Sequence, residues 1–215
     1  MTDVAQPAPL SGRKAQAARN DETILASARA VFLDDPGAPI AAVAKHAGVG
    51  ISALYGRYAS KEELLRKLAG DGLQRFIDEV ETALADDRDA WPVFADFMAR
   101  GVDADTNSLT LALAGTFTPT PEMYANANRS AQLFQELFAR VAAAGVLRAD
   151  LEVHDVSLSF QMIAAIRTSS PERQRALRHR YLALLLEAMK GPGDEALPGP
   201  GPTWAEINER WAPPG

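Results

Sequence analysis

Apolar side chains recur every three or four residues over almost all of residues 20–190, and this spacing most constrains the fold. It is the period of an α-helix with one buried face, and no segment shows the alternation typical of a half-buried β-strand. Proline and glycine interrupt the pattern at a few sites, such as Asp34–Gly37 and Thr118–Pro121. The sequence therefore predicts an all-α protein built from several helices.

The composition excludes several classes of protein. Hydrophobic residues make up 47% and charged residues 23% of the 215 residues, which is typical of a globular chain with one or two domains. The chain has no cysteine, so disulfides, thiol nucleophiles and thiolate zinc sites are excluded. No apolar run approaches the ~20 residues that cross a bilayer, and Met1–Leu10 does not resemble a secretory signal. We expect a cytoplasmic protein with no membrane partner.

Charge is distributed unevenly along the chain. The net charge is −6, but residues 1–68 carry nine Lys/Arg against seven Asp/Glu and are slightly basic. The acidic excess therefore belongs to the rest of the chain. An acidic body with a mildly basic N-terminal region is compatible with DNA binding by that region alone.

The helical pattern divides the chain into four parts. Residues 1–18 are expected to form a flexible arm, and Asn20 or Asp21 to cap the first helix. Ser60 and Glu63 form a capping box before a long helix that ends near Leu84. Thr203 and Glu206 resemble a second capping box in a proline- and glycine-rich tail. The expected parts are the arm 1–18, an N-terminal domain 19–68, a C-terminal helical domain 69–190 and the tail 191–215.

Residues 40–65 carry the most informative motif. Two short helices that cross steeply need a small residue at their crossing, which Ala44 supplies, and a sharp turn, which Gly48 permits. Leu54 falls where the small core must close, in a second helix that is expected from about Ile51 to Tyr58. This spacing predicts a helix-turn-helix, although an ordinary helical hairpin would show similar spacing.

The same region resembles the TetR family of bacterial transcriptional regulators. The resemblance is carried by Ala47-Gly48-Val49, Leu54-Tyr55, Tyr58, Ser60-Lys61-Glu62 and Leu64-Leu65, and by the first-helix residues Ile24, Leu25, Ala28 and Phe32. It implies an N-terminal three-helix DNA-binding domain with a helix-turn-helix, followed by a C-terminal helical bundle for ligand binding and dimerisation. It also implies a homodimer that binds a palindromic operator in double-stranded DNA and is released by a small-molecule effector. Activation or co-repression by the effector is the alternative that the sequence leaves open.

The resemblance assigns candidate DNA contacts by position. Ile51, Ser52 and Ala53 are expected to face base edges, and Arg57 to reach bases or phosphates. Tyr55 and Lys61 correspond to phosphate contacts. Gly56 and the run Ala38-Pro39-Ile40 depart from the family pattern, because neither offers the polar side chain that is common there. A helical protein whose N-terminal DNA-binding domain (residues 19–68, the head) no longer functions is therefore the alternative.

Large apolar residues in the C-terminal domain are either core or the lining of an apolar effector pocket. The candidate pocket residues are Trp91, Phe94, Phe97, Met98, Thr110, Phe117, Tyr124 and Phe160. The last two helices carry a broad apolar arc that fits a dimer interface. The candidate interface residues are Phe160, Leu177, Tyr181, Leu184, Leu185 and Ala188.

An enzyme is the main rival class, and the sequence argues against it. His46, His154 and His179 lie far apart, and no phosphate loop or nucleophile elbow is present. Asp103 and Asp105 are two carboxylates without further metal ligands nearby. We expect no catalytic residues, no metal and no cofactor.

Overall fold

The computed structural model describes residues 12–191, 193 and 195–209. Within these ranges it contains ten α-helices and no β-strand, which confirms the predicted all-α class. The chain divides into two units, residues 1–64 and residues 65–215, and the division falls within helix α4 (Lys61–Leu84). The sequence instead places the boundary after residue 68.

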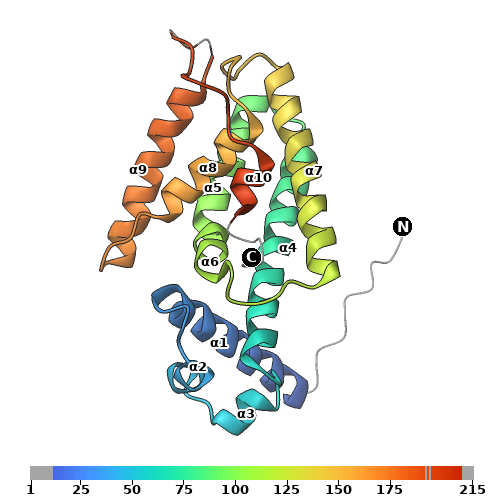
Figure 1. Cartoon of the computed structure of the whole chain (residues 1–215), viewed down its shortest axis with the longest axis vertical. Coiled ribbons are helices and arrows are strands. Elements are labelled where there is room, and N and C mark those ends of the chain that lie inside the picture. Colours follow the sequence, from blue (N-terminus) through green and yellow to red (C-terminus); the bar gives the residue numbers. More distant parts are fainter. Residues whose placement is uncertain (1–11, 192, 194, 210–215) are drawn as a thin grey trace. The chain divides into compact units, whose positions relative to one another are not determined.

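The N-terminal unit contains α1 (Gly12–Asp34), α2 (Ile40–Ala47), α3 (Ile51–Tyr55) and the first turn of α4 (Figure 1). Helix α1 starts earlier than predicted, so the expectation of a flexible arm is wrong from Gly12 onward. Residues 12–19 are rich in alanine, arginine, lysine and glutamine, which favour a helix. They include no large apolar side chain, so they show no apolar stripe in the sequence. Asn20 and Asp21 consequently lie inside α1 and do not cap it. Residues 1–11 lie outside the described part of the chain.

Helix α3 is shorter than predicted. It ends at Tyr55, whereas the sequence suggests a helix up to Tyr58. Gly56 follows directly, and glycine is about 1 kcal/mol less favourable in a helix than alanine. The chain remains tightly wound beyond the helix, because the Tyr58 N–H donates to the Leu54 carbonyl at 2.8 Å.

The C-terminal unit is a bundle of the rest of α4 with five long or medium helices and one short one. The elements are α5 (Ala90–Ala104), α6 (Thr106–Leu113), α7 (Pro121–Ala143), α8 (Val153–Ala164), α9 (Pro171–Met189) and α10 (Trp204–Asn208). Helices α7 and α9 begin with proline after a hydroxyl cap, from Thr120 and Ser170 respectively. Helix α5 contacts α7, α8 and α9 and is therefore central to the bundle.

Phenylalanine rings fill the centre of this bundle. The ring centroid of Phe97 lies 5.9 Å from Phe76, 5.7 Å from Phe134 and 5.9 Å from Phe160. Gly101 allows α5 and α8 to approach, because a Cβ there would lie 2.7 Å from the Phe160 ring. Phe97 is fully buried and Phe160 nearly so, which shows that these rings pack against each other.

The C-terminal segment is partly helical. Thr203 and Glu206 form the capping box expected from the sequence, and α10 follows it. Trp211 lies outside the described residues. Among the described residues, no helix combines the length and apolar character needed to cross a membrane.

Candidate nucleic-acid interface

The turn between α2 and α3 has the geometry that the sequence predicts. Gly48 follows α2 with φ +66°, a left-handed conformation that favours glycine. The Val49 N–H donates to the Ala44 carbonyl at 3.0 Å and closes the end of α2. Gly50 then precedes α3 in an extended conformation. These three steps turn the chain from one short helix into the next.

A small core holds α3 against the rest of the head. Leu54 of α3 is fully buried, as are Val43 of α2 and Phe32 of α1. Tyr58 is 5% exposed and closes the same core after α3. Because Leu54 points inward, the remaining side chains of α3 face outward.

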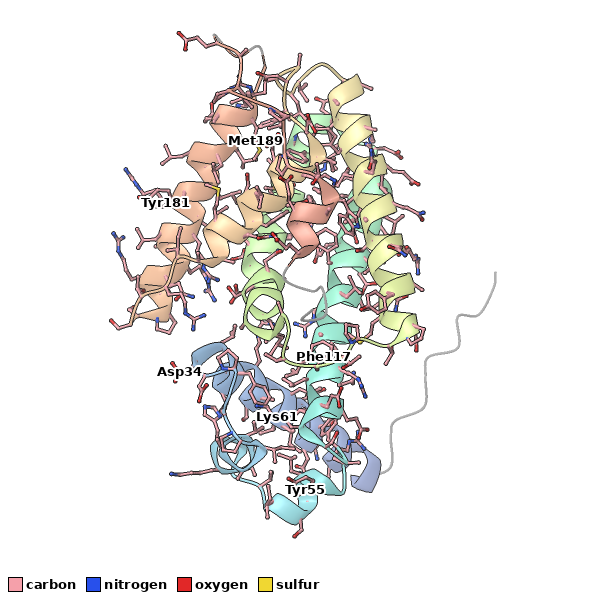
Figure 2. The ribbon with its side chains drawn as sticks, in the orientation of Figure 1. Asp34, Tyr55, Lys61, Phe117, Tyr181 and Met189 are labelled. Carbon is pink, nitrogen blue, oxygen red and sulfur yellow. The ribbon has the colours of Figure 1, made fainter. Side chains whose placement is uncertain are left out.

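The outward face of α3 consists of residues expected to contact DNA. Ile51 is 40% exposed and Tyr55 is 49% exposed, and Ser52 and Ala53 are also exposed. Large apolar side chains are usually buried in a helix of this kind, so the exposed Ile51 and Tyr55 indicate a contact surface. Figure 2 labels Tyr55 on α3.

Arg57 is already paired within the head. Its Nε donates to the Asp21 carboxylate of α1 at 2.9 Å, and the Tyr58 hydroxyl donates to the same oxygen at 2.6 Å. The hydrogen bond to Asp21 raises the pKa of Arg57 above its ordinary value. The Arg57 side chain is nevertheless 49% exposed, so part of the guanidinium can still meet a phosphate or a base. Sequence reasoning missed Asp21, which is 36 positions away in the chain.

Lys61 is also engaged within the head. Its ammonium donates to the Pro36 carbonyl at 3.1 Å and lies 5.1 Å from the centre of the Phe32 ring. It stands at the start of α4, directly after the Ser60 cap (Figure 2). Ser60 Oγ accepts from the Glu63 N–H at 3.1 Å, while the Glu63 carboxylate accepts from Ala59 N–H at 2.7 Å. The predicted capping box is thus present, except that the Glu63 carboxylate accepts from Ala59, the residue before the cap, and not from Ser60 itself.

Two further groups near the turn were not singled out from the sequence. Lys45 and His46 occupy the last turn of α2 and are exposed. At the other end of α2, Pro39 provides no side-chain cap, in agreement with the departure noted from the family pattern. The sequence signal for Lys45 is its position on the polar side of α2.

The expected effector-pocket residues differ in burial. Phe94, Phe97 and Met98 are fully buried in the core, where Phe160 joins them and Trp91 packs at the edge. Phe117 is half-buried. Tyr124 is 51% exposed. The side chain of Thr110 lies outside the described residues. The buried rings of Phe94, Phe97 and Phe160 thus fill the bundle, which is one of the two roles that the sequence left open.

A groove lies elsewhere, between α7, α8 and α10. Its volume is about 590 Å³, and none of the expected pocket residues lines it. Trp204, from the C-terminal segment, is among its lining residues. The sequence gives no signal for this groove, because it depends on where the tail docks.

The expected dimer residues divide into two groups. Tyr181 and Leu184 are 49% and 56% exposed, Ala188 is exposed, and Leu177 and Leu185 are half-buried. Phe160 is 4% exposed, because it packs on Gly101 and Phe97 inside its own subunit. Phe160 was therefore wrongly assigned to an interface. Met162 of α8, which was not assigned, is 59% exposed.

The two aspartates considered as metal ligands have protein partners. Asp103 bonds the His179 ring at 2.8 Å, and Asp105 accepts from Arg178 at 2.6 Å. Arg178 is buried and also donates to Ser108 and to the Ala164 and Ile166 carbonyls. Within the described part of the chain, no group of three or more His, Cys, Asp or Glu side chains is placed to hold a metal.

Comparison with known proteins bears on the head directly. The family model described as bacterial regulatory proteins, tetR family, matches residues 24–68. This range contains α2, α3, the turn between them and the start of α4. Comparison with curated proteins gives no significant match.

Solved structures resemble the chain over most of its length. A TetR transcriptional regulator from Streptomyces coelicolor is 26% identical, with 80% of this chain and 99% of that chain aligned and a TM-score of 0.52. The ketosteroid transcriptional regulator of Mycobacterium tuberculosis is 17% identical, with coverages of 81% and 96% and a TM-score of 0.63. A gamma-butyrolactone receptor is 16% identical, with coverages of 80% and 100% and a TM-score of 0.57.

Proposed function

We propose that this chain is a ligand-responsive repressor of the TetR type, because its residues 24–68 match the model of bacterial regulatory proteins, tetR family. In this proposal a homodimer binds a palindromic operator, and a small-molecule effector releases it. The observation that carries the proposal is the exposed face of α3, where Ile51 and Tyr55 project from a helix fixed by buried Leu54.

Base readout is assigned to the start of α3. Ile51 and Ala53 offer apolar contacts that suit thymine methyl groups, and Ser52 offers a hydroxyl. Arg57 is the candidate for a guanine contact. To make it, the guanidinium must either use its remaining N–H groups or break its hydrogen bond to Asp21. Tyr55 and Lys61 are assigned to phosphates, which position the head without reading sequence.

Dimerisation is assigned to α8 and α9. Their exposed apolar side chains are Met162, Tyr181 and Leu184, with Leu177, Leu185 and Ala188 beside the last two on α9. A protomer rarely leaves so many large apolar groups in water without a partner. A palindromic operator requires such a pair of heads, because one short helix reads too few base pairs.

Effector binding is assigned to the C-terminal unit. An apolar effector bound at the aromatic core around Phe97 would have to displace packed rings, because Phe97 is fully buried against Phe76 and Phe160. Two proteins of the same fold are named for small organic molecules, a ketosteroid regulator and a gamma-butyrolactone receptor, and they support an effector of this kind. Helix α4 belongs to both units, so we assign it the transmission of the effector signal. A coupling of about 1–3 kcal/mol would weaken DNA binding about 5- to 150-fold.

The test is selection of bound sequences from a random DNA pool by the purified full-length protein at moderate salt. Recovery of a palindrome supports the operator and its half-site spacing. Absence of enrichment by a folded dimer would favour the alternative of a head that no longer binds DNA. Steep loss of affinity with rising salt is a second requirement, because phosphate contacts release counterions.

A further inference from the structure

The C-terminal segment is tied to the turn between α7 and α8. The Leu197 N–H donates to the Asp150 carboxylate at 2.7 Å, and Arg148 donates to the Glu195 carbonyl at 2.6 Å. Arg148 also donates to Asp150 at 2.6 Å, and the Arg148 and Leu197 hydrogen bonds hold the pKa of Asp150 well below its usual range. Asp150 is therefore ionised at neutral pH. Farther along, Gly201 is in close contact with Glu152, since a Cβ there would lie 2.7 Å from the Glu152 carboxyl carbon.

This attachment places an aromatic side chain on α8. The Trp204 ring lies 5.8 Å from the His154 ring, with 33° between the two planes. His154 Nδ1 is buried and has no hydrogen-bond partner among the described residues. Figure 1 shows α10 (red) beside α8 (orange), and the two helices are in contact. Trp204 is thus held against the first turn of α8 by its own tail.

Trp204 and His154 form one side of the groove between α7, α8 and α10. A volume of about 590 Å³ lies within the range of small-molecule sites. The α7 side presents three amides, from Asn128, Gln132 and Gln135, and the carboxylate of Glu136. Glu136 is the only charged residue in the described lining, which contains no lysine or arginine.

We propose that this groove binds a planar organic cation between Trp204 and α7. An aromatic face attracts a cation within about 6 Å of its centre, and Glu136 supplies the opposite charge. The amides provide hydrogen bonds to the edges of a flat molecule. The groove borders the Phe97 core, to which the effector is assigned, at Phe134, but none of the expected pocket residues lines it. A cation site there goes beyond the proposed function.

The test is a titration of the full-length protein, without DNA, with acridine orange as a planar cation, followed by fluorescence anisotropy. Fluorescein serves as a planar anion of similar size. We expect acridine orange to bind and fluorescein to bind much more weakly. Trp204→Ala and Glu136→Gln should each weaken acridine orange binding at least about fivefold, since each removes one attraction for the cation.

A matched control lies on the same helix, α7. Glu122→Gln removes an exposed carboxylate, and Glu122 does not line the groove. This control should bind acridine orange as the unaltered protein does. Circular dichroism melting checks that every variant is folded, and Glu136→Gln remains informative even if Trp204→Ala frees the tail. The proposal is overturned if acridine orange does not bind, if fluorescein binds as tightly, or if Glu136→Gln and Glu122→Gln behave alike.

Discussion

Arg57 and Asp21 are joined across the head, with Arg57 Nε 2.9 Å from the Asp21 carboxylate. The pair links the turn after α3 to the middle of α1, and Tyr58 shares the same carboxylate oxygen. The group that we propose to contact DNA is thus oriented by the protein before DNA arrives. Such orientation lowers the entropy lost on binding, but the carboxylate also competes with phosphate for the guanidinium.

Replacing Arg57 by alanine is expected to relax operator preference. Affinity for the selected operator should fall about tenfold or more, because a bidentate arginine–guanine pair discriminates by about 1–3 kcal/mol. Affinity for random DNA should fall much less. Anisotropy titrations with both DNAs measure the two losses, and Arg75→Ala, an exposed arginine of α4, is the control. Equal losses on both DNAs would contradict base readout by Arg57.

Replacing Lys61 by methionine separates its two roles. Methionine keeps an apolar stem on Phe32 but removes the charge and the hydrogen bond to Pro36. We expect DNA affinity to fall similarly on all sequences and the slope of log affinity against log salt to decrease by about two, one for each Lys61 of the dimer. Urea unfolding should show a loss of about 1 kcal/mol from the lost hydrogen bond. An unchanged salt slope with reduced stability would show that Lys61 acts only within the head.

The head could be predicted closely because its constraints are local. Gly48 needs a left-handed backbone, Leu54 must close a core of few residues, and Ser60 caps the helix that follows. The start of α1 could not be placed, because its first residues favour a helix without forming an apolar stripe. The partner of Arg57 could not be predicted either. Asp21 lies 36 positions away in the chain, and its position suggested the N-cap of the first helix.

The body could be predicted only as a helical bundle. An aromatic residue at helical spacing is compatible with a core, a pocket or an interface, and Phe160 shows how the choice depends on a distant residue. Its ring fits against α5 only because Gly101 has no side chain. The groove at Trp204 depends on the hydrogen bonds that dock the tail at Asp150. Neither relationship leaves a periodic signal in the sequence.

Replacing Leu184 by aspartate is expected to separate the proposed dimer. Leu184 is 56% exposed on α9, and a twofold interface would contain it twice. Losing the burial of two leucines, at about 1.5–3 kcal/mol each, should raise the dimer Kd about a hundredfold or more. Light scattering over a range of concentrations measures the change. Leu197→Asp, at an exposed leucine of the C-terminal segment, should leave the mass unchanged, and a Leu184→Asp protein that remains dimeric would exclude this surface.

Replacing Arg178 by methionine is expected to lower the free energy of unfolding by about 3 kcal/mol or more, because Asp105 loses the partner that compensates its charge. The same change frees Ser108 and the carbonyls at the end of α8, while methionine retains most of the packing of the arginine stem. Urea unfolding monitored by circular dichroism measures the loss. His179→Ala breaks the neighbouring pair with Asp103, in which both side chains are at least 40% exposed, and should change the free energy by about 1 kcal/mol at most. Similar losses in the two variants would show that burial of Arg178 does not set the strength of its contacts.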